Sequence, residues 1–243
     1  MALEWYLMNS SHLSGLEEDD FNVDKGGFSE LTASFIGTDI QIYGDCITNT
    51  PVPKRAIIQG VTRGSVELFD ERKILCAIGT LACGQYIKFN NQWWLVASMP
   101  SNNLVYEKAV LWYCQYPLKF INPGTAIIVE YPIPTESATN GSGEKSTRYI
   151  TLGATERVIY LPYNAVTAKI NNGYRFLIDR RSTDVKAYKV TNVDTTSFMW
   201  GSIGLIRLVC EEDPLRSTDN VSTKVADNTS LSAGGDTEGE VWT

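Results

Sequence analysis

Few residues of the chain have the types and spacing that catalysis requires. The sequence contains one histidine, His12, which lies in a polar stretch. Ser-His-Asp and Cys-His arrangements and multi-histidine metal sites each need an imidazole at a defined place beside an orienting partner. Because His12 has no such context, we interpret it as a solvated residue.

Carboxylates are the other groups with catalytic potential, and they cluster at 17–20, 70–71 and 211–213. A glycosidase could be built from two carboxyls held roughly 5 to 9 Å apart. The clusters lie at predicted turns and strand ends, where acidic side chains are ordinarily solvated, and their spacing selects no pair. Calcium-loop and phosphate-loop patterns are absent. We therefore predict no catalytic residue, no metal site and no cofactor, and expect the protein not to be an enzyme.

An adjacent pair of aromatic residues, Trp93 and Trp94, could form a stacking platform for sugars or bases. The pair follows Asn90-Asn91, which suits a two-residue hairpin turn because asparagine tolerates positive φ. Strand alternation then places the two tryptophans on opposite faces. We predict that Trp94 is a core residue and that Trp93 faces outward as a candidate subunit contact.

Composition limits the possible partners and compartment. The 243 residues carry a formal net charge of −7, which disfavours broad clamping of nucleic acid because that affinity comes from neutralised phosphates. The cysteines are odd in number and lack CxxC spacing, so free thiols in a reducing compartment are expected. The sequence contains no secretion signal and no apolar stretch of the ~20 residues that span a bilayer. We expect synthesis in the cytoplasm of the cell that produces the protein, and no membrane association.

The elements that must position these residues are mostly strands. Apolar residues at 28, 31, 35 and 36 predict one short helix that ends at Gly37. From residue 38 onward, β-branched and aromatic segments alternate with turn residues at a spacing of about 8 to 12 residues. This pattern predicts an all-β fold of small barrels or sandwiches.

Part of the β pattern occurs twice. Gly84 and Gly173 each begin a strand, and Trp94-Leu95-Val96 and Tyr188-Lys189-Val190 each lie in the next one. A third strand ends in Cys114 in the first copy and in Cys210 in the second. The repetition favours two tandem modules, with Trp94 and Tyr188 at equivalent positions.

Three segments outside the modules are candidate partner contacts. The N-terminal apolar arm of residues 3–8 includes Trp5, Tyr6 and Leu7, and the polar C-terminal region ends near Trp242, which is either a docking residue or incidental. The polar loop of residues 135–147 is either a channel or docking loop or a plain hairpin tip. Its candidate residues are Asn140, Gly141, Ser142, Gly143, Glu144 and Lys145.

These boundaries divide the chain into four parts. They are an N-terminal arm and linker at 1–27, a first β module at 28–120, a second at 121–216, and a flexible C-terminal tail at 217–243.

The stretch from Lys54 to Phe120, with Gly84, Tyr86, Trp94 and Val96 in its turn and strand pattern, resembles the head-closure (stopper) proteins of the head-tail connector in tailed bacteriophages. Residues 174–220 are similar to segments of neighbouring phage structural proteins. Stoppers are often one small barrel, whereas two modules are predicted here.

The resemblance implies a ring-forming structural protein in the virion neck that closes the DNA-filled head and joins it to the tail. The implied partners are further copies of the chain, portal or adaptor and tail proteins, and packaged DNA that passes without sequence-specific binding. Two alternatives remain: another neck or tail component, such as an adaptor or tail-completion ring, and a receptor- or carbohydrate-binding β module.

Overall fold

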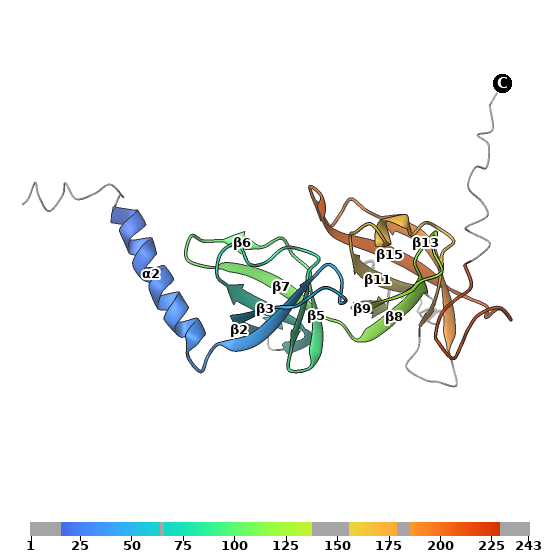
Figure 1. Cartoon of the computed structure of the whole chain (residues 1–243), viewed down its shortest axis with the longest axis horizontal. Coiled ribbons are helices and arrows are strands. Elements are labelled where there is room, and N and C mark those ends of the chain that lie inside the picture. Colours follow the sequence, from blue (N-terminus) through green and yellow to red (C-terminus); the bar gives the residue numbers. More distant parts are fainter. Residues whose placement is uncertain (1–15, 64–65, 138–155, 179–184, 229–243) are drawn as a thin grey trace, which may run out of the picture.

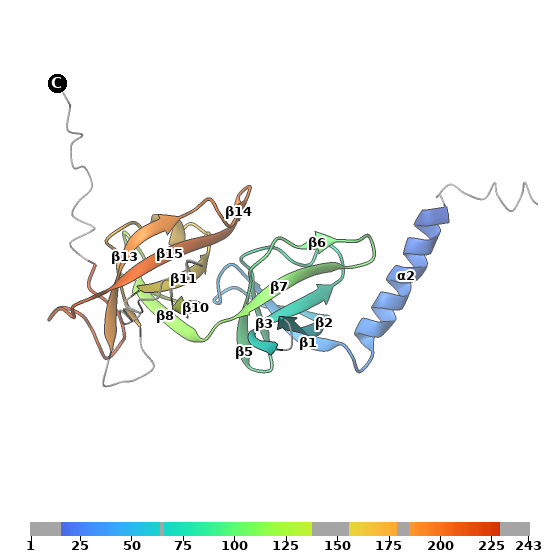
Figure 2. The same cartoon turned by 180° about the vertical axis from the view of Figure 1, so that it is seen from behind.

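The structure is a computed structural model that describes residues 16–63, 66–137, 156–178 and 185–228. Two β modules lie next to each other along the long axis, and one helix projects at the outer end of the first module (Figures 1 and 2). The predicted all-β class with two tandem modules and one helix is confirmed.

The helix, α2 (Leu16–Ala33), begins earlier than the sequence pattern predicted. The segment before residue 28 was interpreted as an acidic linker, but it is helical from Leu16 and the helix starts with the run Leu-Glu-Glu-Asp-Asp. Negative residues stabilise the N-terminus of a helix, where the backbone dipole is positive. The acidic run is therefore a helix start.

The first module is a closed barrel of six strands. The ladder runs β3-β2-β1-β4-β5-β7, and pairing between β3 and β7 closes it, while β6 adds to the edge at β7. The strands are β1 (Thr38–Gly44), β2 (Val52–Arg63), β3 (Val66–Cys76), β4 (Tyr86–Phe89), β5 (Gln92–Val96), β6 (Ser101–Asn102) and β7 (Glu107–Tyr113).

The tight connection between β4 and β5 is the predicted asparagine turn. Asn90 and Asn91 have φ values of 49° and 59°, and Phe89 pairs with Gln92 directly across the turn. Two consecutive positive-φ residues give the twist that a two-residue hairpin needs. The turn therefore sets the register that places Trp93 and Trp94 on opposite faces.

The second module contains a curled sheet in the order β10-β11-β15-β13-β12, with a separate hairpin of β8 and β9. A short strand, β14, pairs with β15, and a 3-10 turn, η1 (Thr167–Lys169), precedes β12. The strands are β8 (Tyr116–Ile121), β9 (Ile128–Ile133), β10 (Thr135–Ser137), β11 (Glu156–Pro162), β12 (Arg175–Ile178), β13 (Lys186–Asp194), β14 (Met199–Trp200) and β15 (Ile203–Asp213).

Strands β9 and β10 together take the place that β2 has in the first barrel. The first half of β2 pairs with β1 and its second half pairs with β3. Likewise, β9 pairs with β8 and β10 pairs with β11, with Pro134 between them. Proline cannot donate to a ladder, so a break at this residue is expected.

The internal repeat extends to the backbone hydrogen bonds. The amide of Gly84 donates to the carbonyl of Val96 at 2.9 Å, and the amide of Gly173 donates to that of Val190 at 2.7 Å. Both glycines have positive φ, 83° and 89°. Trp94 and Tyr188 are each 3% exposed. The two tight turns and the strands that they join are therefore equivalent.

The cysteine correspondence inferred from the sequence was wrong. Val96 pairs with Leu111, and its counterpart Val190 pairs with Cys210, so Cys210 corresponds to Leu111 and not to Cys114. Both strands end near a cysteine, but register is set by the ladder and not by the last residue of an apolar run.

A shared hydrophobic core joins the modules. It combines first-module residues such as Leu95 and Ala97 with second-module residues such as Leu118, Ile159 and Leu205. At the junction, the buried Tyr86 hydroxyl donates to the Pro132 carbonyl at 2.8 Å. The connection between modules lies at residues 114–115, so a boundary after residue 120 would divide β8.

Residues 217–228, which the sequence pattern assigned to a flexible tail, pack against the second module. Val225 and Ala226 are 5% and 1% exposed, and Asp219 forms a buried ion pair with Arg175 at 2.8 Å. The segment is polar in composition, but its few apolar and acidic residues meet partners that only the fold brings close.

Candidate functional site

Trp94 lies in the core of the first barrel, as the strand alternation predicted. Its ring stacks on Phe89 at a centroid distance of 5.2 Å and packs against Tyr113 at 5.2 Å. Because these two rings cover it, the indole is not an exposed stacking platform. Its Nε1 is buried and has no hydrogen-bond partner in the structure.

Trp93 points to the other face of β5 and is partly buried against the core shared by the modules. Its ring contacts Tyr43 at a centroid distance of 4.7 Å, and the Lys88 amine lies 5.1 Å from its centre. Trp93 thus makes contacts within its own chain. Its predicted role in contacting another subunit stays a prediction.

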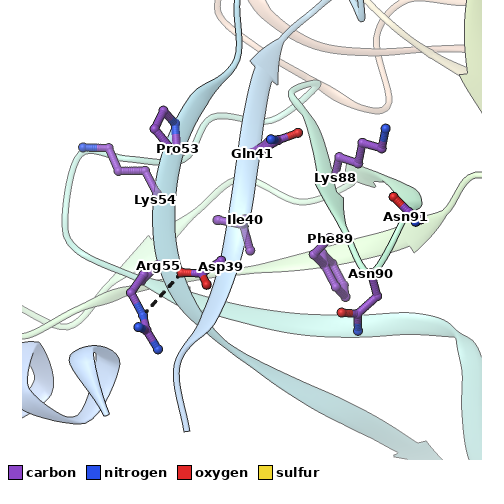
Figure 3. Close-up of a pocket in the computed structure, with 10 residues that line it drawn as sticks. All are labelled: Asp39, Ile40, Gln41, Pro53, Lys54, Arg55, Lys88, Phe89, Asn90 and Asn91. Atoms are coloured by element: carbon purple, nitrogen blue, oxygen red, sulfur yellow. Dashed lines mark ion pairs between the residues drawn. The ribbon is translucent and has the colours of Figure 1, made fainter. Parts of the chain in front are cut away.

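A shallow groove with several basic residues crosses β1, β2 and the β4–β5 turn (Figure 3). Lys54, Arg55 and Lys88 line it together with Asp39. The Arg55 Nε atom lies 3.7 Å from a carboxylate oxygen of Asp39. Figure 3 shows the two lysine side chains extending away from each other on either side of β1. The groove therefore does not focus its positive charge on one point, as a bound phosphate would require.

An apolar groove runs between α2 and the neighbouring loops of the first barrel, and it encloses about 620 Å³. The helix contributes Phe28 and Ala33, and the barrel loops contribute Ala77, Ile78 and Val105. Ile78 is 42% exposed. The polar residues that line the groove are Lys25, Ser29, Thr32 and Arg55.

Further apolar side chains are exposed on the segments that line this groove or that adjoin its lining residues in sequence. On α2 and the turn that follows it, Leu31, Phe35 and Ile36 are 45%, 96% and 44% exposed, and on the barrel loop Leu104 is 53% exposed. Exposed apolar residues that gather in one region mark interaction sites, whereas scattered ones do not. We call the groove and these four residues the helix-side surface.

Two contacts hold α2 against the barrel and so shape this surface. The Arg55 guanidinium donates to the carbonyls of Ser34 and Gly37, both at 2.8 Å, just beyond the end of the helix. A cation there satisfies carbonyls that the helix leaves open. In addition, Phe28 stacks on Tyr106 at 5.1 Å.

A buried carboxylate fixes the loop that carries Ile78. Glu107 is 5% exposed and accepts hydrogen bonds from the backbone amides of Gly79, Thr80 and Leu81 at 3.0, 2.7 and 2.5 Å. This carboxylate satisfies three backbone donors, so its role is to hold the loop and with it one wall of the groove.

The thiols do not form a reactive centre within the described chain. Burial raises the pKa of Cys76, Cys83 and Cys210 to about 12, and burial also raises that of Cys114 well above its ordinary value. Thiols with such pKa values remain protonated near neutral pH and are poor nucleophiles. Only Cys46 is partly exposed.

Two side chains of the third acidic cluster, at 211–213, form ion pairs with basic residues. In the third cluster, Asp213 binds Arg175 at 2.5 Å, and Glu212 pairs with Lys186 at 3.0 Å. Among residues 16–63, 66–137, 156–178 and 185–228, no group of three or more His, Cys, Asp or Glu residues could hold a metal ion.

Several predicted contact residues lie outside the described residues. They are Trp5, Tyr6 and Leu7 of the arm, Trp242, and the loop residues Asn140, Gly141, Ser142, Gly143, Glu144 and Lys145. His12 also lies outside them. Their predicted roles stay predictions.

The helix-side surface was not identified from the sequence. Leu31, Phe35 and Ile36 were predicted to share the apolar face of a helix ending at Gly37, but α2 ends at Ala33 and all three are substantially exposed. Helical periodicity shows which residues share a face but not what covers it. In the described part of the chain, no helix has the length and apolar character needed to cross a membrane.

Two family models match the chain in succession. The YomX N-terminal domain matches residues 11–113, and the YomX C-terminal domain matches residues 116–211. The division between them coincides with the junction of the two β modules. Both domains are phage-associated. No curated protein and no solved structure matches the chain.

Proposed function

The chain belongs to the YomX family, whose N- and C-terminal domains it carries in order, and on this basis we propose that it is a structural protein of the phage particle. More specifically, we propose a non-enzymatic subunit of the head-tail connector. Copies of it would form a ring in the neck of the virion, where the ring closes the filled head and joins it to the tail.

The observation that carries the proposal is the helix-side surface. Phe35, which is 96% exposed, lies in the turn that follows α2, and the helix itself projects at the outer end of the first module (Figure 1). Exposed apolar side chains lose their contact with water when a partner covers them. A surface at one end of an elongated subunit that meets a different surface of the next copy gives a ring when the rotation closes.

The joined modules also suit a structural role. The two modules share one hydrophobic core, so no flexible hinge separates them. The two ends of each subunit would therefore keep a fixed distance and orientation. The net charge of −7 would let DNA pass through a channel without adhering to its wall. Portal or adaptor proteins and tail proteins are the proposed neighbours on either side of the ring.

The proposal is tested with the full-length chain. Light scattering after size-exclusion chromatography should show a ring-sized oligomer, either alone or with a portal-type partner, and gold-labelled antibody should bind at the neck of purified phage. A phage that lacks the gene should make heads that carry no tails and do not retain their packaged DNA. A chain that remains monomeric with every virion partner and is absent from purified particles would contradict the proposal.

The carbohydrate-binding alternative has less support in the structure. Stacking of a sugar requires an exposed aromatic face, but Trp94 is covered by Phe89 and Tyr113, and Trp93 is packed against Tyr43. Binding to a glycan array by a monomeric chain would nevertheless favour that alternative.

A further inference from the structure

The apolar groove beside α2 lacks a described occupant, although its walls are well fixed. Phe28 on one wall is held by Tyr106, and the loop that carries Ile78 on the other wall is held by Glu107. A groove with fixed walls is ready for a partner because little conformational freedom is lost when the partner binds.

The chain itself supplies a segment of matching chemistry. Residues 3–8 read Leu-Glu-Trp-Tyr-Leu-Met, with Glu4 as the only charge. Tryptophan and tyrosine are the residues that most often anchor an interface in an apolar pocket. The groove is lined by apolar residues together with Lys25, whose charge is opposite to that of Glu4, and with Arg55, which also binds Asp39 and the turn after α2.

We propose that the apolar arm of residues 3–8 docks into the α2 groove of a neighbouring copy. This inference rests on the proposed ring and names the contact that would hold it together. The first residue of α2 lies at the end of the helix away from the barrel (Figures 1 and 2). From Leu16 to Phe28 the helix rises about 18 Å, at ~1.5 Å per residue.

The arm therefore starts from a point well away from its own groove and close to the outer end of the subunit. The seven residues between the arm and Leu16 let Met8 lie at most about 28 Å from Leu16, a reach that covers an adjacent copy as well as the chain's own groove. An arm from one subunit in a groove of the next gives a head-to-tail contact that repeats around a ring.

The docking is tested with a fluorescent peptide of residues 1–12. The receptor is the full-length chain carrying Leu7→Asp, because the added charge keeps its own arm out of the apolar groove. Adding Ile78→Asp to this receptor should weaken peptide binding ~10-fold or more, since a charge would be buried at the contact. The matched control Ile127→Asp changes a residue of the second module that is 64% exposed and should leave binding unchanged.

Equal binding of the peptide to the Leu7→Asp receptor, its Ile78→Asp derivative and its Ile127→Asp derivative would overturn the proposed groove. A peptide that itself carries Leu7→Asp should not bind. Circular dichroism of each receptor verifies that the substitution has not unfolded the barrel.

A complementation experiment tests whether the contact forms between copies. The Leu7→Asp chain keeps a groove but loses its arm, and the Ile78→Asp chain keeps its arm but loses the groove. Neither should assemble alone, whereas an equal mixture should form a heterodimer in light scattering. Failure to form it, while the peptide still binds, would overturn docking between copies.

The two proposals can fail separately. If the unaltered chain forms rings that Leu7→Asp and Ile78→Asp do not affect, arm docking is wrong and the ring proposal stands. If the peptide binds as expected and the heterodimer forms but no closed ring does, the arm contact stands and the ring proposal fails.

Discussion

The two β modules follow one strand order but protect the corresponding strand edge in different ways. In the first module, β4 pairs with β5 on one side and with β1 on the other, so both edges are in ladders. In the second module, β12 pairs with β13 only, and its other edge faces β8 without a ladder.

A side chain covers that open edge in the second module. Asn228 accepts a hydrogen bond from the amide of Arg175 at 2.7 Å and donates one to its carbonyl at 3.0 Å. The amide group of asparagine thus takes the place of a neighbouring strand. An uncovered edge would offer its backbone groups to other chains.

The equivalent position in the two modules carries very different residues. Tyr86 pairs with Leu95, and its counterpart Arg175 pairs with Lys189. Tyr86 is buried at the module junction, whereas the buried Arg175 binds Asp219, Asp213 and the carbonyl of Pro214. Burial opposes the ionisation of Asp219, but hydrogen bonds from Arg175 and two backbone amides outweigh it and lower its pKa.

The comparison shows that one barrel plan can be completed by a ladder or by a polar segment. In the first module, strand β1, which precedes β4 in the sequence, pairs with the edge of β4 and so closes the sheet. In the second, residues 213–228 return to β12 after the last strand and close it through a buried ion-pair network. The C-terminal segment is therefore part of the second module.

The largest predicted effect comes from breaking that network. Arg175→Met leaves Asp219 buried without its cation, and we expect a loss of about 3–5 kcal/mol in the free energy of unfolding. The control Lys186→Met removes the partner of Glu212 in an exposed pair and should cost about 1 kcal/mol or less. Urea unfolding measures both values. Similar losses for the two variants would mean that the network does not close the module.

A smaller effect is expected from the tight turn of the first module. A Cβ atom on Gly84 would lie 2.7 Å from the carbonyl oxygen of Gly204 in the second module, and its φ is +83°. Gly84→Ala should cost about 2–3 kcal/mol through strain and overlap. Gly124→Ala, at φ +81° with open space around it, should cost only the strain of about 1 kcal/mol. Thermal unfolding measures both costs, and their difference reports the contact of residue 84 with Gly204. Equal costs would show that this contact between the modules does not contribute to stability.

The smallest predicted effect concerns the residue that corresponds to Arg175. Tyr86→Phe removes a buried hydrogen bond to Pro132 and leaves that carbonyl without this donor, which should cost about 1–2 kcal/mol. Tyr43→Phe removes an exposed bond to Gln41 and should be nearly neutral. If urea unfolding gives the same stability for both variants, Tyr86 does not couple the modules.

Short-range features of the fold were predictable from the sequence. The asparagine turn followed from residues that accept positive φ, and the opposite directions of Trp93 and Trp94 followed from strand alternation. The equivalence of Trp94 and Tyr188 also followed from local pattern. Each of these depends on a few neighbouring residues, for which backbone sterics leave few choices.

Features that depend on distant residues were not predictable in the same way. An arginine in the apolar strand Tyr-Arg-Phe-Leu-Ile was a possible signal of a buried cation, but its partners Asp213, Asp219 and Asn228 follow it at long and irregular separations. The helix-side surface was missed because periodicity identifies an apolar face without showing what covers it.

The sequence by itself therefore determined the β class, the two modules, the asparagine turn and the equivalence of Trp94 and Tyr188, because these follow from local conformational preferences. Only the tertiary structure decided that the modules share a core, that residues 217–228 complete the second module, and that α2 leaves an apolar groove open. These features are set by burial and ion pairing between residues far apart in the chain, and their partners are defined only when the barrels have formed.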